Sequence, residues 1–175
     1  MMIKVRDFKK TYRHITVHQP HLDLPEKSIL KGPNGCGKST LFKALAGVIS
    51  FEGRLEAPKS LFYLPVKAPL PHQPIQNYLA FSKGLGRVLF HDFFSVDEWP
   101  LLPNACSSGM RQKLRLIWAL SWPSEGLLLD EPLQALDRAS AAWVMRILNA
   151  WEKPVCIITH QAELYPDWPA VPWTH

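Results

Sequence analysis

The pattern of hydrophobic and polar residues predicts strands and helices that alternate along the chain. Strand patterns cover residues 3–8, 28–31, 54–56, 61–64, 126–130 and 155–159. Apolar residues at helical spacing predict helices over 38–48, 108–120 and 138–151. The last two strand patterns are nearly uninterrupted apolar runs, which is typical of strands buried on both faces of a sheet. Because strands alternate with helices, we expect an α/β fold of βαβ units around a mainly parallel sheet.

The pattern is weaker between Pro65 and Pro103, where prolines also stand at positions 69, 71, 74 and 100. Proline lacks a backbone N–H and clashes with the preceding helical turn, so it interrupts helices. This segment therefore has room for short helices only over 75–84 and 88–94.

Length and composition fit one globular domain. The 175 residues are 47% hydrophobic and 20% charged, which argues against a disordered chain. No apolar stretch approaches the roughly 20 residues that a membrane-spanning helix needs, and the first residues lack the apolar core of a signal peptide. The three cysteines, Cys36, Cys106 and Cys156, lie far apart without metal-ligand spacing, and their odd number fits reduced thiols in a cytosol. We therefore expect a cytoplasmic protein.

The net charge of +5 is a mild excess of basic residues. It permits a phosphate-bearing ligand or an anionic surface, but the basic residues are scattered, and an ordinary solvated surface explains them more simply. No nucleic-acid partner is expected.

Residues 32–39 read GPNGCGKS and fit the phosphate-loop pattern G-x-x-x-x-G-K-[ST] without a mismatch. Gly32, Gly35 and Gly37 permit backbone conformations that a Cβ would obstruct, so that successive N–H groups can point at phosphate oxygens. A strand is predicted before the loop and a helix after it, as the motif requires. A glycine-rich turn that matches the pattern by chance is the alternative.

The residues at the end of the loop supply the chemistry of a nucleotide site. Lys38 is a compact positive charge that can reach the β- and γ-phosphates, and the Ser39 hydroxyl can ligate Mg²⁺. Thr40 can support the α-phosphate region, and the helix adds its positive N-terminal end. The candidate nucleotide-contacting residues of the loop are Asn34, Gly35, Cys36, Gly37, Lys38, Ser39 and Thr40.

A second candidate group lies in LLLDEP, where an apolar strand ends in Asp130 and Glu131. Parallel sheets bind ligands beyond the carboxyl ends of their strands, where this acidic pair is expected. Asp130 would hold Mg²⁺, and Glu131 would orient and polarise an attacking water. Many strands end in an acidic turn without a catalytic role, but a complete phosphate loop in the same chain favours the functional interpretation.

Between these motifs lies CSSGM, residues 106–110, directly before a predicted helix. Ser107 or Ser108 can cap that helix and leave N–H groups free to bind an anion. Taken alone, these residues are an ordinary helix cap.

The order of five motifs, over nearly the whole chain, resembles that of the ATP-binding cassette (ABC) ATPases. GPNGCGKST is close to the phosphate loop of that family, and LLLDEP matches its Walker B strand. CSSGM stands where the family usually has LSGGQ, so that Ser107 and Gly109 match while the first, third and fifth residues depart from the pattern.

The resemblance implies roles for further residues. Residues 133–137, LQALD, stand at the position of the D-loop, with Asp137 as its acid, and ITHQ resembles the switch strand, with His160 sensing the γ-phosphate. A lone histidine after a strand would otherwise be structural. Lys38, Glu131 and His160 would be the catalytic residues. Tyr12 would stack on adenine, with packing on the surface or in the core as the alternative.

One element of the family is missing. A glutamine usually follows a strand such as LFYLP, and Val66 stands at that place. In the family this glutamine touches the metal and relays the nucleotide state to the partner subunit. Gln73 or Gln76 could replace it if the loop is rearranged. The departure bears on coupling more than on hydrolysis.

The implied fold is a P-loop NTPase with a RecA-like core, a reduced α-helical subdomain and a small N-terminal β subdomain. Residues 1–65 and 122–175 would form the nucleotide-binding core of a single ABC ATPase domain, 1–175. Residues from about 66 to 121 would form the helical subdomain, which ends in the signature helix.

The implied function is ATP binding and hydrolysis, with Mg²⁺, in a subunit of an ABC transporter. A second ATPase subunit would cover the nucleotide with Ser107, Ser108, Gly109 and Asp137 in a head-to-tail sandwich. A separate transmembrane permease, docked on the helical region between residues 66 and 105, would hold the protein at the cytoplasmic face of the membrane.

Two other functions stay open at this point. One is an ABC ATPase outside transport, such as a DNA-maintenance or translation factor, and the other is a nucleotide-dependent regulatory subunit that hydrolyses poorly. Among transporters, the compact helical region and the Thr-His-Gln ending are similar to the short ATPases of haem-export cytochrome c biogenesis systems.

Overall fold

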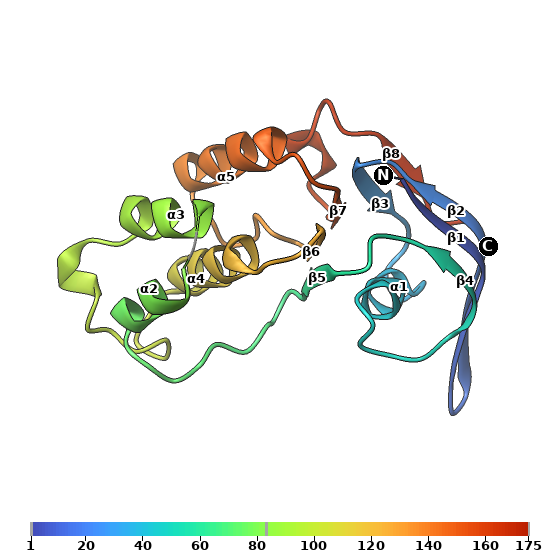
Figure 1. Ribbon diagram of the computed structural model, residues 1–175, viewed down its shortest axis with the longest axis horizontal. Helices are drawn as coiled ribbons and strands as arrows, with labels where there is room; N and C mark the ends of the chain where they lie inside the picture. The colour runs from blue at the N-terminus through green and yellow to red at the C-terminus, as the bar shows by residue number, and fades with distance from the viewer. Residues whose placement is uncertain (1, 83, 175) are drawn as a thin grey trace. The chain divides into compact units, whose positions relative to one another are not determined.

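The computed structural model describes residues 2–82 and 84–174, and these divide into two compact units (Figure 1). The first unit comprises residues 2–65, 124–131 and 151–174, and the second comprises the remainder. Residues 132–150, expected in the nucleotide-binding core, belong to the second unit. The assignment of a core and a helical subdomain within one ATPase domain stays a prediction.

A five-stranded sheet forms the centre of the first unit, with the order β5-β6-β7-β3-β8 and parallel pairing throughout. The strands are β3 (Lys27–Lys31), β5 (Leu61–Leu64), β6 (Gly126–Asp130), β7 (Val155–Ile158) and β8 (Ala170–Pro172). All residues of β6 and β7 are buried, as their apolar runs predict. The α/β fold with a parallel sheet is therefore confirmed, and the carboxyl ends of β3, β6 and β7 lie at one edge.

An antiparallel sheet of the same unit has the order β2-β1-β4. Its strands are β1 (Ile3–Tyr12), β2 (Ile15–Leu24) and β4 (Glu52–Glu56). The small N-terminal β subdomain is thus present, but the sequence pattern missed β2 and ended β1 at residue 8.

The reason for the missed strand is visible in the pairing of β1 with β2. The register skips the position at which Asp7 faces Pro20, and Asp7 has a positive φ of 51°. Proline cannot donate to a ladder, so it is tolerated in a strand where the pairing is locally interrupted. The sequence shows the proline but not the irregularity that accommodates it.

Helix α1 (Lys38–Leu45) and the inner faces of both sheets share one hydrophobic core. Phe8 from β1, Leu41 and Phe42 from α1, and Leu128 from β6 are buried members of this core. The helix ends at Leu45 rather than at residue 48, because Gly47 has a left-handed φ of 70° and such a glycine commonly terminates a helix.

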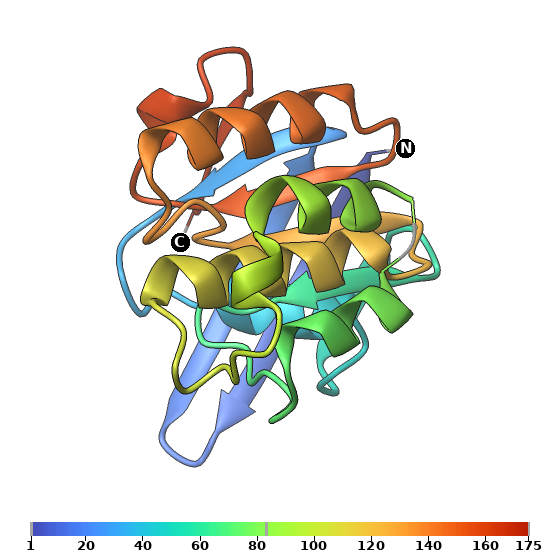
Figure 2. The same ribbon diagram turned by 90° about the vertical axis from the view of Figure 1, so that its left-hand side faces the viewer.

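The second unit is helical. Its helices are the short η1 (Ile75–Asn77), α2 (Tyr78–Phe81), α3 (Leu85–Phe93), η2 (Val96–Glu98), α4 (Ser108–Ser121) and α5 (Arg138–Ala150). Helices α3 and α4 lie side by side (Figure 2). The short helices expected in the proline-rich segment are present, but α3 begins at Leu85 because Gly84, with a φ of 50°, separates it from α2. Among residues 2–82 and 84–174, no helix is long and apolar enough to cross a membrane.

Helix α3 packs closely on α4 at Gly86. A Cβ at this position would lie 1.9 Å from Oγ of Ser121 and 2.7 Å from the carbonyl oxygen of Ile117. We expect Gly86→Ala to lower the free energy of unfolding by about 1–3 kcal/mol, the usual cost of overpacking, in urea unfolding experiments. Arg87→Ala, at an exposed position of the same helix, is the matched control. Equal stability of the two variants would contradict the close packing.

Candidate nucleotide-binding site

The phosphate loop connects β3 to α1, and two of its glycines have backbone conformations that other residues rarely adopt. Gly35 and Gly37 have φ angles of 78° and 115°. A Cβ on Gly37 would also lie only 2.1 Å from Cγ1 of Val17, so this position requires glycine for two reasons. No side-chain hydrogen bond caps α1, and the N–H groups of its first turn are available to an anion.

The Lys38 side chain is buried beside this loop, with 8% of its surface exposed. Its Nζ donates hydrogen bonds to the carbonyl oxygens of Gly32 and Pro33, both at 2.8 Å. A buried ammonium group needs such acceptors because it has lost water. The two carbonyls therefore hold the positive charge close to the N-terminus of α1.

Ser39 and Asp130 meet in the first unit although they are far apart in the sequence. The Ser39 hydroxyl donates to Oδ2 of the buried Asp130 at 2.7 Å, and the Tyr63 hydroxyl approaches the same oxygen at 3.4 Å. Burial, followed by the negative charge of Asp130, raises the pKa of Tyr63 to about 12. The tyrosine thus stays protonated and can donate to Asp130 at neutral pH.

This pair of oxygen groups fits Mg²⁺. The ion prefers oxygen ligands and is commonly held by one or two protein groups together with phosphate and water oxygens. Ser39 and Asp130 are of that chemical type, and both lie next to a loop suited to phosphate. The residues predicted to hold the metal are therefore brought together.

Glu131 follows at the end of β6 and turns toward the end of β7. Its backbone has a φ of 49°, and its N–H donates to the carbonyl oxygen of Ile158 at 2.8 Å. Its carboxylate accepts hydrogen bonds from the Thr159 hydroxyl at 2.9 Å and from the His160 backbone N–H at 2.8 Å. Nε2 of His160 lies 3.8 Å from the same carboxylate. The two predicted catalytic residues Glu131 and His160 are neighbours.

A cavity of about 490 Å³ lies beside the phosphate loop. Its lining residues are Leu30, Lys31, Gly32, Lys38, Thr159, His160, Ala162 and Glu163. Its size is in the usual range of small-molecule sites. Of the predicted catalytic residues, Lys38 and His160 line the cavity, whereas Glu131 does not.

The other predicted nucleotide contacts of the first unit are at least partly accessible. Asn34 is exposed, and Cys36 and Thr40 are half-buried. Tyr12 is 42% exposed at the end of β1, with Nζ of Lys10 over its ring at 5.6 Å from the centroid. Its exposure excludes packing in the core, and the stacking role of Tyr12 stays a prediction.

Three residues that hold this site were not assigned a role from the sequence. Tyr63 touches Asp130, and Thr159 touches Glu131. The N–H of Trp173 donates to the last residue of β3 at 2.6 Å, and a Cβ on Gly32 would lie 2.7 Å from Cβ of Trp173. Thr159 had a sequence signal, because it stands within ITHQ. Trp173 had none, because it follows a three-residue strand that begins after Pro169 and itself ends in Pro172.

In the second unit, Ser107 caps α4. Its Oγ accepts a hydrogen bond from the Met110 N–H at 3.1 Å, which confirms the cap. Ser107 and Ser108 are exposed. A Cβ on Gly109 would lie 2.8 Å from the carbonyl oxygen of Ala135, so a side chain there would displace the neighbouring loop. A contact of this turn with a nucleotide on a second subunit stays a prediction.

Asp137 caps α5. Its carboxylate accepts hydrogen bonds from the backbone N–H and the hydroxyl of Ser140, both at 2.8 Å, and lies 3.6 Å from Nζ of Lys113. The hydrogen bonds from Ser140 hold the pKa of Asp137 at about 2, so the carboxylate is ionised at neutral pH. Asp137 therefore has a structural role in its own helix, and its role across a second subunit stays a prediction.

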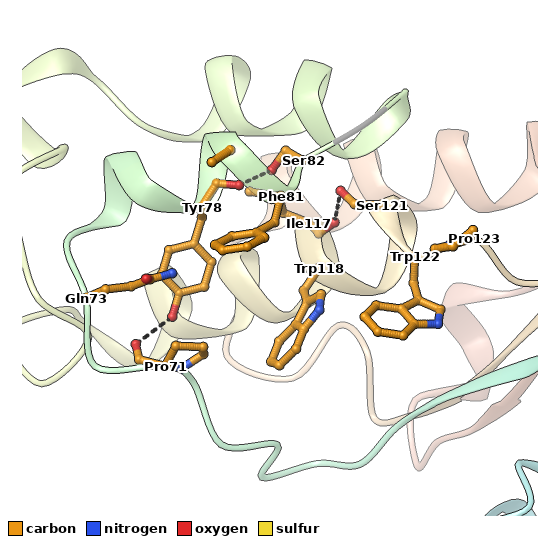
Figure 3. A pocket seen from close by; sticks show the side chains of 11 residues that line it. Pro71, Gln73, Tyr78, Phe81, Ser82, Ile117, Trp118, Ser121, Trp122 and Pro123 are labelled. Atoms are coloured by element: carbon orange, nitrogen blue, oxygen red, sulfur yellow. Dashed lines mark hydrogen bonds between the residues drawn. The ribbon is translucent and has the colours of Figure 1, made fainter.

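The second unit also carries an apolar pocket of about 590 Å³, in which aromatic rings from α2 and α4 stand close together (Figure 3). The lining residues are Pro71, Gln73, Tyr78, Ala80, Phe81, Ser82, Ile117, Trp118, Ser121, Trp122 and Pro123. Phe81 and Trp122 are 63% and 49% exposed.

The position of the missing glutamine and its two candidate replacements all belong to the second unit. Val66 is half-buried, Gln73 lines the apolar pocket, and Gln76 is exposed in η1. Replacement of the missing glutamine by Gln73 or Gln76 stays a prediction.

No protein-family model matches the chain. The chain is 27% identical over 192 residues to the molybdate/tungstate import ATP-binding protein WtpC of Pyrococcus abyssi, over 93% of this chain and 56% of that protein. It is 31% identical over 139 residues to elongation factor 3A of Saccharomyces cerevisiae, over 75% of this chain and 13% of that protein. A solved bacterial Atm1-family ABC exporter with ATP bound matches with a TM-score of 0.84 at 17% identity, over 99% of this chain and 37% of that one.

The parallel core, the antiparallel sheet and the phosphate loop define the P-loop fold of ABC ATPases. The chain has this fold and is similar, at modest identity, to ATP-binding proteins of ABC transporters. It spans about half the length of the WtpC relatives that it matches, 56% and 52%.

The two glycines with positive φ angles, Gly35 and Gly37, offer a matched test of the loop. Gly37→Ala should weaken binding of a fluorescent ATP analogue at least 10-fold, because a Cβ there meets Val17 and the backbone angle excludes alanine. Gly35→Ala should have a smaller effect, because nothing lies within 4 Å of its added Cβ and a left-handed alanine costs about 1–2 kcal/mol. Equal losses in the two variants would show that the contact with Val17 does not matter.

Proposed function

We propose that the chain is the ATP-binding and ATP-hydrolysing subunit of an ABC transporter. The observation that carries the proposal is the hydrogen bond between Ser39 and Asp130, directly before Glu131. This hydrogen bond brings the start of α1, which is suited to phosphate, next to Asp130 at the end of β6. Ser39 and Asp130 supply two oxygens that can bind a metal, and the carboxylate residue Glu131 follows directly in the sequence. This set of groups supports transfer of the γ-phosphoryl group of ATP to water.

Each residue has a distinct task in the proposed reaction. Lys38 and the N–H groups at the start of α1 would hold the β- and γ-phosphates. Ser39 and Asp130 would hold Mg²⁺, which neutralises negative charge on phosphate oxygens when it is bound. Glu131 would orient the attacking water, and His160 would contact the γ-phosphate. The rate gain would come mainly from positioning and charge stabilisation.

A second ATPase subunit would complete each site with Ser107, Ser108, Gly109 and Asp137. The exposure of both serines supports this arrangement. The first departure from the family signature, Cys106, is buried and its thiol approaches the carbonyl oxygen of Leu102 at 3.3 Å. This departure therefore affects packing inside the unit rather than the serines that would face the nucleotide.

The reaction is tested by Glu131→Gln. We expect a variant that binds ATP and forms a dimer in its presence but hydrolyses it at least 100-fold more slowly, because the amide cannot take up a proton from water. Measurements are phosphate release and size-exclusion chromatography with and without ATP. Glu152→Gln, at an exposed carboxylate of the same unit outside the cavity, is the control. Wild-type turnover in Glu131→Gln would reject the role of Glu131.

Two other functions are alternatives to the proposed one. An ABC ATPase outside transport is supported by the 31% identity to elongation factor 3A. A regulatory subunit that hydrolyses poorly is disfavoured, because Lys38, Asp130 and Glu131 are all present and held by defined hydrogen bonds. An ATPase assay with and without a co-expressed permease separates these functions from the proposed one.

The proposed permease would dock on the helical unit and keep the chain at the cytoplasmic face of a membrane. The apolar pocket with its exposed Phe81 and Trp122 supports such a contact, because exposed aromatic patches commonly mark protein interfaces. Haem export, implied by the resemblance to cytochrome c biogenesis ATPases, is the substrate assignment that the captured permease would test.

The docking surface is tested by Phe81→Asp. We expect this variant to lose co-purification with the permease from detergent-solubilised membranes, because a charge would be buried in an apolar contact. Val96→Asp, at a 68% exposed position of the same unit outside the pocket, should retain the permease. The captured membrane protein must also stimulate ATP hydrolysis in liposomes. Retention of the permease by Phe81→Asp would place the contact elsewhere.

A further inference from the structure

Three hydrogen bonds fix the backbone and the carboxylate of Glu131. A φ of 49° is uncommon for a residue with a side chain and persists only where the surroundings enforce it. Here the enforcement comes from three consecutive residues at the end of β7. The carbonyl oxygen of Ile158 accepts from the Glu131 N–H, while Thr159 and His160 donate to the two carboxylate oxygens.

Among these donors, the Thr159 hydroxyl is the one side-chain group. Nε2 of His160 lies 3.8 Å from the Glu131 carboxylate, beyond hydrogen-bond distance. The direction of the Thr159 hydroxyl is also fixed. The N–H of Gln161 donates to Oγ1 of Thr159 at 3.0 Å, so the hydroxyl hydrogen is left to point at Oε2 of Glu131 at 2.9 Å. A β-branched side chain has little rotamer freedom, so this direction costs little entropy.

We infer that Thr159 is a positioning residue for hydrolysis, which fixes the Glu131 carboxylate so that its remaining lone pairs face the attacking water. A carboxylate offers about four lone-pair sites, and the two observed hydrogen bonds leave the others free. Fixing the base in advance avoids reorganisation during the reaction, which is a main source of enzymatic rate. The inference rests on the proposed function, because it assigns Thr159 to the same reaction.

The opposite interpretation is that the hydrogen bond from Thr159 to Glu131 inhibits hydrolysis. If the hydrogen bond instead kept Glu131 away from water, its removal would accelerate hydrolysis. The two interpretations predict changes of opposite sign in kcat, so one substitution decides between them.

The test is Thr159→Val, which removes the hydroxyl and keeps the shape, with Thr159→Ser as the conservative variant. We expect kcat for ATP to fall about 10-fold or more in Thr159→Val, as for loss of a hydrogen bond to a charged group, with KM unchanged within about 2-fold. Thr159→Ser should restore most of kcat. Thr11→Val, which removes an exposed hydroxyl in the β1–β2 hairpin, should match the wild type.

A double-mutant cycle separates positioning from general damage. In a Glu131→Gln background, Thr159→Val should cause no further loss in single-turnover rate, because the residue through which it acts is already disabled. A full additional 10-fold loss, an unchanged kcat in the single variant, or a raised kcat would each overturn the inference.

Failure of the proposed function has a different signature. It would appear as absent hydrolysis in the wild type or as wild-type turnover in Glu131→Gln. Normal wild-type hydrolysis, an inactive Glu131→Gln and an unaffected Thr159→Val would reject only the role of Thr159. Thr159→Ala is the second variant if Thr159→Val does not fold.

Discussion

The parallel pairing of β6 with β7 is the constraint on which the first unit depends. The register of this pair places Asp130 beside Ile158. The residues that follow them, Glu131 and Thr159, therefore lie together at the sheet edge. Both strands are buried along their whole length. A shift by one residue would reverse the direction of every side chain and carry an acid into the core. The apolar runs therefore fix the carboxylates as well as the sheet.

The fold and the site could be predicted from the sequence where neighbouring residues carry the signal. The phosphate loop and the apolar runs of β6 and β7 are local signals, because each is encoded in consecutive residues. The strands β2 and β8 are not local in that sense. Pro20 and Pro172 suppress the strand pattern, and only pairing with β1 and β3 shows where a proline fits. The role of Trp173 against Gly32 follows from that pairing and has no sequence signal.

The proline-rich segment shows a related limit. Prolines lack N–H groups, so a chain rich in them has fewer backbone donors with which to hold itself. The structure replaces these with side-chain donors: the Tyr78 hydroxyl bonds the carbonyl oxygen of Pro71, and Nε of Arg115 bonds that of Ala68, at 2.9 and 2.8 Å. Sequence pattern predicts that such a segment is irregular. It does not predict which side chains secure it, because donors and acceptors are up to 47 residues apart.

Lys38 shows how the loop combines the demands of stability and binding. An ammonium group has three donors, and two of them already bond the carbonyl oxygens of Gly32 and Pro33. The Cys36 sulfur, a weak acceptor, lies 3.8 Å from the same Nζ. A phosphate oxygen is a far stronger acceptor for a charged donor. Binding of a nucleotide would therefore exchange a weak contact for a strong one while the two carbonyls keep the charge in place. Nucleotide binding requires little further desolvation of Lys38, because this side chain is already buried in the folded chain.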